Sequence, residues 1–115
     1  MTIVDSDHSQ LLAKAMDVYA LRQRITAANI ANIDTPGFKK LSVSFEDELR
    51  KVSQQEHRRG QLYQVNPRIS EASGKPVLEN EMIEMVDTQV RVQLLTRSLR
   101  HHFDLLRMGI SGRSI

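Results

Sequence analysis

The residue types that could carry out catalysis or hold a metal are few in this chain of 115 residues, and they are poorly spaced for either task. Its four histidines are His8, His57, His101 and His102, and the last two are adjacent, so on a helix their side chains point about 100° apart. A pair spaced i and i+4 would chelate a metal better. The chain has no cysteine and no glycine-rich phosphate loop. We therefore expect no catalytic residue, no metal site, no cofactor and no enzymatic activity.

Residues 28–39 offer a different chemistry, hydrogen bonding at the end of a helix. They read Ala-Asn-Ile-Ala-Asn-Ile-Asp-Thr-Pro-Gly-Phe-Lys. Asn29 and Asn32 are three residues apart, so both side-chain amides lie on one side of the last helical turns. There they can bond carbonyl groups that the helix end leaves without partners.

The helix must stop at the next residues. Thr35 precedes a proline and is pushed out of the helical region of backbone space. Pro36 suits the first central position of a turn, and Gly37 can take the positive φ that a type II turn requires at the second. The sequence therefore predicts a helix, a sharp turn and then an aromatic anchor, Phe38.

The segment before the turn has helical spacing. Leu11, Val18 and Ile25 recur every seven residues, and Leu21 is interleaved with them. This narrow apolar line predicts an N-terminal helix over residues 8–32.

The C-terminal segment carries a stronger pattern, with residues at alternating steps of four and three. These positions are Leu78, Met82, Met85, Gln89, Val92, Thr96, Leu99, Phe103, Leu106 and Ile110. Eight of the ten are apolar, and no Gly or Pro falls between residues 77 and 108, so we expect one helix over 78–110. Further apolar residues beside this line widen the stripe, which implies more than one neighbour for the helix.

Charge is distributed unevenly along this second helix. Residues 79–90 carry four acidic side chains and no Lys or Arg, whereas residues 91–115 carry five Arg against one Asp. Acid at the start and base at the end both complement the helix dipole. The same arrangement would let copies that are staggered along an axis attract each other end to end.

Between the two helices the pattern weakens. Residues 41–45 alternate briefly, as in a short extended piece, and Ser44 followed by Asp47 resembles a capping box for a short helix that ends near Gln54. Residues 53–76 are mostly polar with scattered Gly and Pro, so we expect a loosely structured linker over the middle segment, 33–77.

Composition excludes several classes of protein. No apolar run approaches the roughly 20 residues of a membrane span. The first ten residues contain Asp5 and Asp7 and lack an apolar stretch, so we expect no cleavable signal peptide. A net charge of +2 with 26% charged residues predicts a mixed, solvated surface rather than a polybasic one.

Two stretches carry a family resemblance. The run Asn-Ile-Ala-Asn-x-Asp-Thr-Pro-Gly-Phe-Lys in 29–39 resembles the N-terminal signature of the bacterial flagellar axial proteins, which form rod and hook. Residues 77–86, and the continuation from Gln89 through Arg107, are similar to the C-terminal helix of the short proximal rod members of that family. The chain departs from the family at Val92, where an aromatic is usual, and in running on past Arg107 to Ile115.

The resemblance implies an all-α fold in which the N- and C-terminal helices pair as a coiled-coil domain, with 1–115 as a single rod-type domain. It implies a structural subunit of the flagellar basal body that polymerises into the proximal rod, transmits torque and surrounds the export channel. The implied location is the periplasmic rod, reached through flagellar export. The implied partners are further copies, other flagellar rod proteins, a FliE-type adaptor, the MS ring and the export gate, with no nucleic acid and no membrane span.

The residues that matter under this hypothesis form two sets. The family motif comprises Asn29, Asn32, Asp34, Thr35, Pro36, Gly37 and Phe38. The assembly seam between helices comprises Leu11, Val18, Leu21, Ile25, Met82, Met85, Val92, Leu99, Phe103 and Leu106.

Two other classes of function remain open. A soluble helical-hairpin adaptor or regulator would have the same two helices but leaves residues 29–39 unexplained. A nucleic-acid-binding module would rest on Arg97, Arg100, Arg107 and the patch His57-Arg58-Arg59. Interspersed acidic residues weaken that second alternative.

Overall fold

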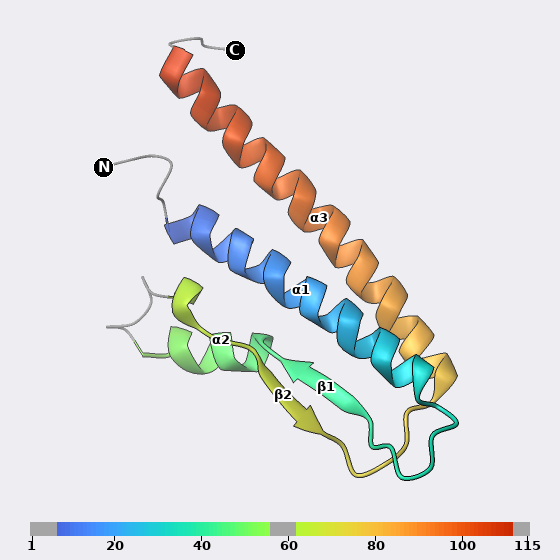
Figure 1. Ribbon diagram of the computed structural model, residues 1–115. Helices are drawn as coiled ribbons and strands as arrows, with labels where there is room; N and C mark the ends of the chain where they lie inside the picture. The colour runs from blue at the N-terminus through green and yellow to red at the C-terminus, as the bar shows by residue number, and fades with distance from the viewer. Residues whose placement is uncertain (1–6, 56–61, 112–115) are drawn as a thin grey trace.

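The computed structural model describes residues 7–55 and 62–111. In chain order the elements are α1 (Asp7–Ala31), β1 (Leu41–Ser44), α2 (Glu46–Ser53), β2 (Arg68–Glu71) and α3 (Leu78–Ser111). The two long helices lie side by side and run in opposite directions, and β1, β2 and α2 pack on the other side of α1 (Figure 1). The protein is thus an antiparallel helix pair with a small mixed unit attached.

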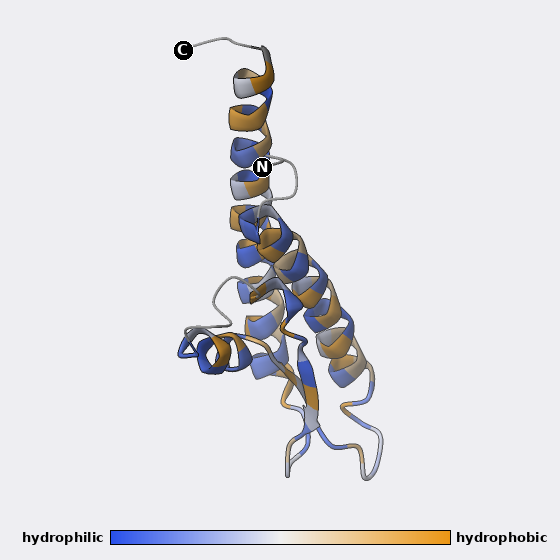
Figure 2. Cartoon of the chain, turned by 90° about the vertical axis from the view of Figure 1, so that its left-hand side faces the viewer, coloured by the Kyte–Doolittle hydropathy of each residue, from blue (hydrophilic) through white to orange (hydrophobic). Residues whose placement is uncertain are grey.

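Both long helices fall where the sequence predicts them, within one residue at each end of 8–32 and 78–110. The 34 residues of α3 span about 50 Å at 1.5 Å per residue, whereas α1 has 25 residues. The C-terminal end of α3 therefore extends beyond the start of α1. In the turned view this end rises clear of the other described elements (Figure 2). The antiparallel pairing is thus observed, while the description of the pair as a coiled coil stays a prediction.

The turn after α1 has the predicted geometry. Gly37 has φ 79° and is the one residue with positive φ in the described part of the chain. The Phe38 N–H donates to the Thr35 carbonyl at 3.2 Å, which closes the four-residue turn around Pro36 and Gly37. Asn32 Nδ2 donates to the Ala28 carbonyl at 2.8 Å, as expected for an amide at a helix end.

The fold is mostly helical, as predicted, but it also contains a small two-stranded sheet, so the prediction of an all-α fold with a loose middle segment holds only in part. β1 and β2 pair antiparallel with Leu41 opposite Glu71 and Ser44 opposite Arg68, so polar residues expected in a linker form a strand. The predicted extended piece near 41–45 and the short helix after it are both present as β1 and α2. The capping box is not: Phe45 is the N-cap residue of α2 and makes no side-chain cap bond.

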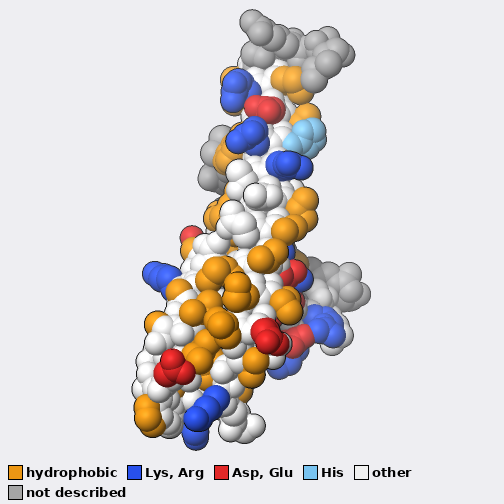
Figure 3. Space-filling view, turned by 90° about the vertical axis from the view of Figure 1, so that its right-hand side faces the viewer, with side chains coloured by type: hydrophobic (Ala, Val, Ile, Leu, Met, Phe, Trp, Pro, Cys, Tyr) orange, Lys and Arg blue, Asp and Glu red, His pale blue; other side chains and the backbone are white. Residues whose placement is uncertain are grey.

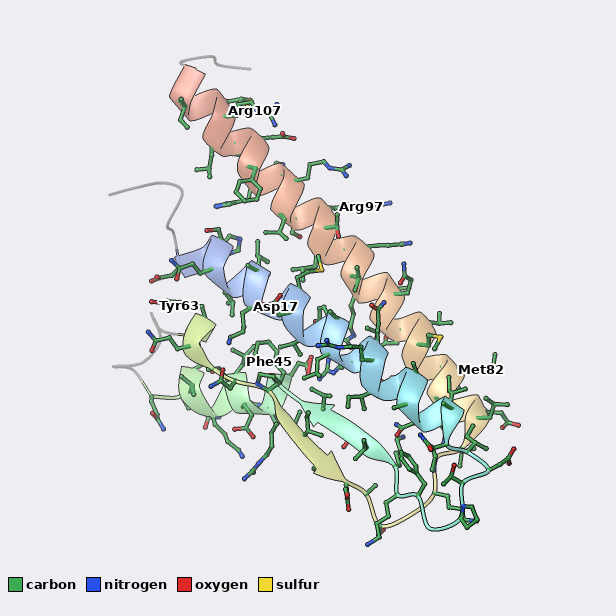
Figure 4. All side chains as sticks on the ribbon, viewed as in Figure 1. Asp17, Phe45, Tyr63, Met82, Arg97 and Arg107 are labelled. Carbon is green, nitrogen blue, oxygen red and sulfur yellow. The ribbon has the colours of Figure 1, made fainter. Side chains whose placement is uncertain are left out.

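A small apolar core holds the mixed unit against α1. It consists of Val18 from α1, Phe45 between β1 and α2, and Val65 from the segment after α2, all 6% exposed or less. Phe45 lies between α1 and the sheet in the side-chain view (Figure 4). Val18 therefore packs against the middle segment, and its role in the assembly seam stays a prediction.

The line of α3 that faces α1 also differs from the predicted one. The inner line follows Glu81, Thr88 and Leu95, which are spaced by seven and are 1%, 1% and 9% exposed. Met82 and Phe103 belong to the predicted assembly seam, but they are 54% and 48% exposed and are not part of this inner line. The polar residues Glu81 and Thr88 form part of the contact between α3 and α1. A prediction based on apolar residues alone therefore begins this line at Met82, one residue later.

Candidate assembly interface

Asn29 is the centre of a buried polar joint between three parts of the chain. Its side chain is 1% exposed and donates from Nδ2 to the Leu41 carbonyl at 2.8 Å and to Glu81 Oε1 at 2.6 Å. Its Oδ1 accepts the Leu41 N–H at 3.0 Å. Asn29 was predicted to bond the end of its own helix; instead it bonds β1 and α3, because the turn at Gly37 returns the chain alongside α1.

Glu81 and Lys40 complete the joint. The Glu81 carboxylate is 1% exposed, and its Oε2 lies 3.1 Å from Lys40 Nζ, an ion pair without the alignment of a hydrogen bond. A buried carboxylate is tolerated only when it is paired and bonded. The start of α3 is thus tied to both the end of α1 and the entry to β1. This role of Glu81 was not predicted, because an apolar pattern assigns a carboxylate to the surface and its partners Asn29 and Lys40 are distant in sequence.

A second polar contact ties α1 to α2. Arg22 donates from Nη1 to Glu46 Oε1 at 2.6 Å, from Nη2 to Glu46 Oε2, and from Nη2 to the Val43 carbonyl at 3.1 Å. The Glu46 carboxylate raises the pKa of Arg22, and the hydrogen bonds from Arg22 lower the pKa of Glu46. This bidentate pair holds the start of α2 in place without the predicted cap.

These two contacts line a groove of about 400 Å³ between α1, β1 and the first half of α3. On the α3 side Arg91 Nε donates to Asp87 Oδ2 at 2.9 Å, and this bond raises the pKa of Arg91. Most charges in the groove are therefore paired with each other. Across the described residues, no three His, Asp or Glu side chains are grouped so that they could hold a metal ion.

The side of α3 that faces away from α1 carries an apolar surface, which we call the outer patch. It consists of Met82, Ile83, Val86, Val90 and Leu94, whose exposed fractions run from 49% to 66%. Hydrophobic side chains gather over the lower half of this face, with acidic and basic side chains around them, and further basic side chains and a His lie toward its upper end (Figure 3). Met82 and Arg97 both point away from α1 (Figure 4). Large exposed apolar patches on small proteins mark sites of association.

The predicted motif and seam residues are distributed over these features. Asp34, Thr35, Pro36 and Gly37 are exposed at the tip of the turn, and Phe38 is half-buried. The seam residues Leu11, Leu21, Ile25, Val92, Leu99 and Leu106 are half-buried, and Met85 is 38% exposed. The patch His57-Arg58-Arg59 and residues 112–115 lie outside the described residues. Within the described ranges, no helix has the length and apolar character to cross a membrane.

Residues 10–39 match the protein family described as flagella basal body rod protein. The chain is 29% identical over 105 residues to the flagellar basal body rod protein FlgB of Buchnera aphidicola, covering 81% of this chain and 79% of that protein. It is 51% identical over 49 residues to FlgB of Borreliella burgdorferi and 49% identical over 41 residues to FlgB of Escherichia coli. These two matches span only 33% and 30% of the relatives' length. No solved structure matches the chain.

Proposed function

Because this chain belongs to the flagella basal body rod protein family, we propose that it is a structural subunit of the flagellar basal body. In this proposal it polymerises into the proximal rod, transmits torque and surrounds the export channel, and it is not an enzyme. The family match covers the motif at Asn29–Phe38, which a soluble adaptor would not need. The adaptor is therefore not the favoured alternative.

The observation that carries the proposal is the outer patch. Five large apolar side chains, 49% to 66% exposed, lie along one side of α3 over about three helical turns. Large apolar side chains gathered this closely are normally buried, because removing apolar surface from water is favourable by roughly 25 cal/mol per Å². Packing against neighbouring subunits is the arrangement that buries such a stripe in a polymer.

The buried joint has a supporting role in the proposal. Asn29, Glu81 and Lys40 fix where α3 starts relative to α1, and the turn at Gly37 directs the chain into β1. They therefore hold the outer patch in one orientation, as a repeating contact requires. The family motif acts, in this view, through the geometry of the subunit and not through a direct contact of every motif residue.

The proposed location is the periplasmic rod of the basal body, with the chain exported through the flagellar apparatus. The proposed partners are further copies of the chain and other rod proteins. A FliE-type adaptor, the MS ring and the export gate would be neighbours at the base. The single rod-type domain would comprise the whole chain. The charged, exposed surface of α3 beyond Leu94 is compatible with protein contacts of this kind.

The test is replacement of Val86 by Asp in the source bacterium. Val86 is 65% exposed, so the isolated chain should keep its helical circular dichroism, whereas a charge in the buried contact should prevent incorporation into basal bodies. We expect swimming in soft agar to be lost and basal bodies, counted by electron microscopy, to be rare.

The matched control is His101→Asp, an exposed position on the same side of α3 but outside the patch, which should swim like the parent. Normal swimming and normal basal bodies in Val86→Asp would contradict the proposed function of this surface.

A further inference from the structure

A second apolar surface lies at the other end of α3. We call it the end patch, and it consists of Phe103, Leu106 and Ile110, of which Phe103 is 48% and Ile110 73% exposed. His102, one residue before it, lies 5.4 Å from the His8 ring, centroid to centroid, at the start of α1. The end patch therefore begins where the contact with α1 ends, on the part of α3 that rises above the other described elements (Figure 2).

The two patches point in nearly opposite directions. At about 100° per residue, the outer patch is centred about 180° from the inner line of Glu81, Thr88 and Leu95. The end patch lies within about 60° of that inner line, because it continues the same side of the helix past the start of α1. One neighbour packed along α3 cannot cover both patches.

The charges near the two patches are opposite in sign. Glu79, at the base of the outer patch, and Arg100, beside the end patch, are both exposed, and neither forms an ion pair within the described residues. The acidic residues of α3 cluster at its start, and Arg predominates at its end. The start of the outer patch of one copy is therefore complementary in charge to Arg100 beside the end patch of another.

We propose that the outer patch of one copy of this chain binds the end patch of a second copy, with their α3 helices parallel and staggered. This inference rests on the proposed function and specifies the contact that builds the polymer. The partner is a second copy because both surfaces are apolar and carry residues of opposite charge beside them, Glu79 and Arg100.

The sequence spacing fixes the size of the stagger. Phe103 follows Met82 by 21 residues, Leu106 follows Val86 by 20, and Ile110 follows Val90 by 20. Arg100 follows Glu79 by 21 residues, so the charged pair comes into register at the same offset as the apolar pairs. Twenty helical residues correspond to a shift of about 30 Å along the axis.

This contact is open rather than closed. Each copy uses one patch toward the neighbour below and the other patch toward the neighbour above, and the two patches face opposite sides. A contact between different surfaces that does not close generates a helical filament. An antiparallel pair of copies would need both patches on one face and would bring acidic Asp87 of one copy near Asp104 of the other.

The experiment uses disulfide cross-linking in basal bodies, which is clean because the chain contains no cysteine. Two differently tagged copies are expressed together, one carrying Val90→Cys and the other Ile110→Cys, both at exposed positions. Under mild oxidation we expect a mixed dimer at least tenfold more abundant than that from the control pair Val90→Cys with His101→Cys. Glu79→Arg in the Val90→Cys copy should reduce the yield severalfold, and Arg100→Glu in the Ile110→Cys copy should restore it.

The outcomes separate this inference from the proposed function. If the cysteine strains swim but Val90→Cys links mainly to itself, or no better to Ile110→Cys than to His101→Cys, the staggered contact is overturned and the rod function stands. If the tagged, cysteine-free parent is absent from purified basal bodies, the proposed function itself is overturned.

Discussion

Replacing Asn29 by Asp should make the stability of this protein depend strongly on pH. The two side chains have nearly the same shape, so the buried site is kept, and Oδ1 can still accept the Leu41 N–H. The atom that donates to Glu81 Oε1 at 2.6 Å becomes a carboxylate oxygen. Two carboxylates then face each other in a site where both residues are 1% exposed.

The size of the effect follows from the cheaper of two ways to relieve this clash. Two charges about 3 Å apart repel by roughly 5 kcal/mol at an effective dielectric constant of about 20. Keeping a proton on one carboxyl of ordinary pKa, about 4, costs about 1.4 kcal/mol per pH unit, or about 4 kcal/mol at pH 7. Lys40, 3.1 Å from Glu81, offsets part of either cost. We expect a loss of about 2–4 kcal/mol at pH 7.

The assay is urea unfolding of the purified chain, followed by circular dichroism between pH 4 and pH 7. The free energy of unfolding of Asn29→Asp should approach that of the parent as pH falls toward 4, because a protonated carboxyl can again donate to its neighbour. The matched control is Asn66→Asp. Asn66 is exposed and accepts from Lys14 Nζ at 3.1 Å, so the same substitution should be neutral or slightly stabilising there.

Two results would refute this reasoning. A loss of stability that is the same at pH 4 and pH 7 would mean that shape, not charge, limits the site. No loss at pH 7 would mean that Asn29 and Glu81 are not in contact in solution, and the tie between α1 and α3 would have to be abandoned.

Two further predictions concern the turn and the contact with α2. Gly37→Val should destabilise the protein by roughly 1–3 kcal/mol, and Gly37→Asn by less. The φ of Gly37 is 79° and nothing lies within 4 Å of an added Cβ, so backbone strain alone determines the effect. Thermal unfolding of both variants checks this order, and equal melting temperatures would contradict it. Arg22 lowers the pKa of Glu46, so their pair contributes stability above the pKa of the unfolded carboxyl, and this contribution is lost as pH falls through the lowered folded value. Glu46→Gln should therefore flatten the acid side of the stability profile, and an unchanged slope would count against the pair.

The helices and the turn could be predicted because their determinants are local. The absence of Gly and Pro between residues 77 and 108 extends α3, and Pro36 with Gly37 restricts the backbone of the turn regardless of its surroundings. Such signals depend only on residues close in sequence, and α1 and α3 lie where they were expected.

The small sheet and the inner line of α3 could not be predicted because their determinants are distant in sequence. Ser70 in β2 is polar and exposed, and its strand exists only because β1 lies beside it. Glu81 can be buried because Asn29 donates a hydrogen bond to its carboxylate and Lys40 forms an ion pair with it. An apolar pattern assigns such a residue to the surface, which explains why Met82 was chosen in its place.

The joint between Asn29 and Glu81 also orders events in time. The two residues are separated by 52 positions, whereas the core of Val18, Phe45 and Val65 needs only the chain up to residue 65. If the chain becomes available from its N-terminus, α1 can dock onto β1 and α2 while Asn29 still lacks its carboxylate, because the core is complete at Val65 and Glu81 follows later in the chain. The outer patch would take its final orientation only in that last step, so a chain in transit would not yet present the surface through which it polymerises.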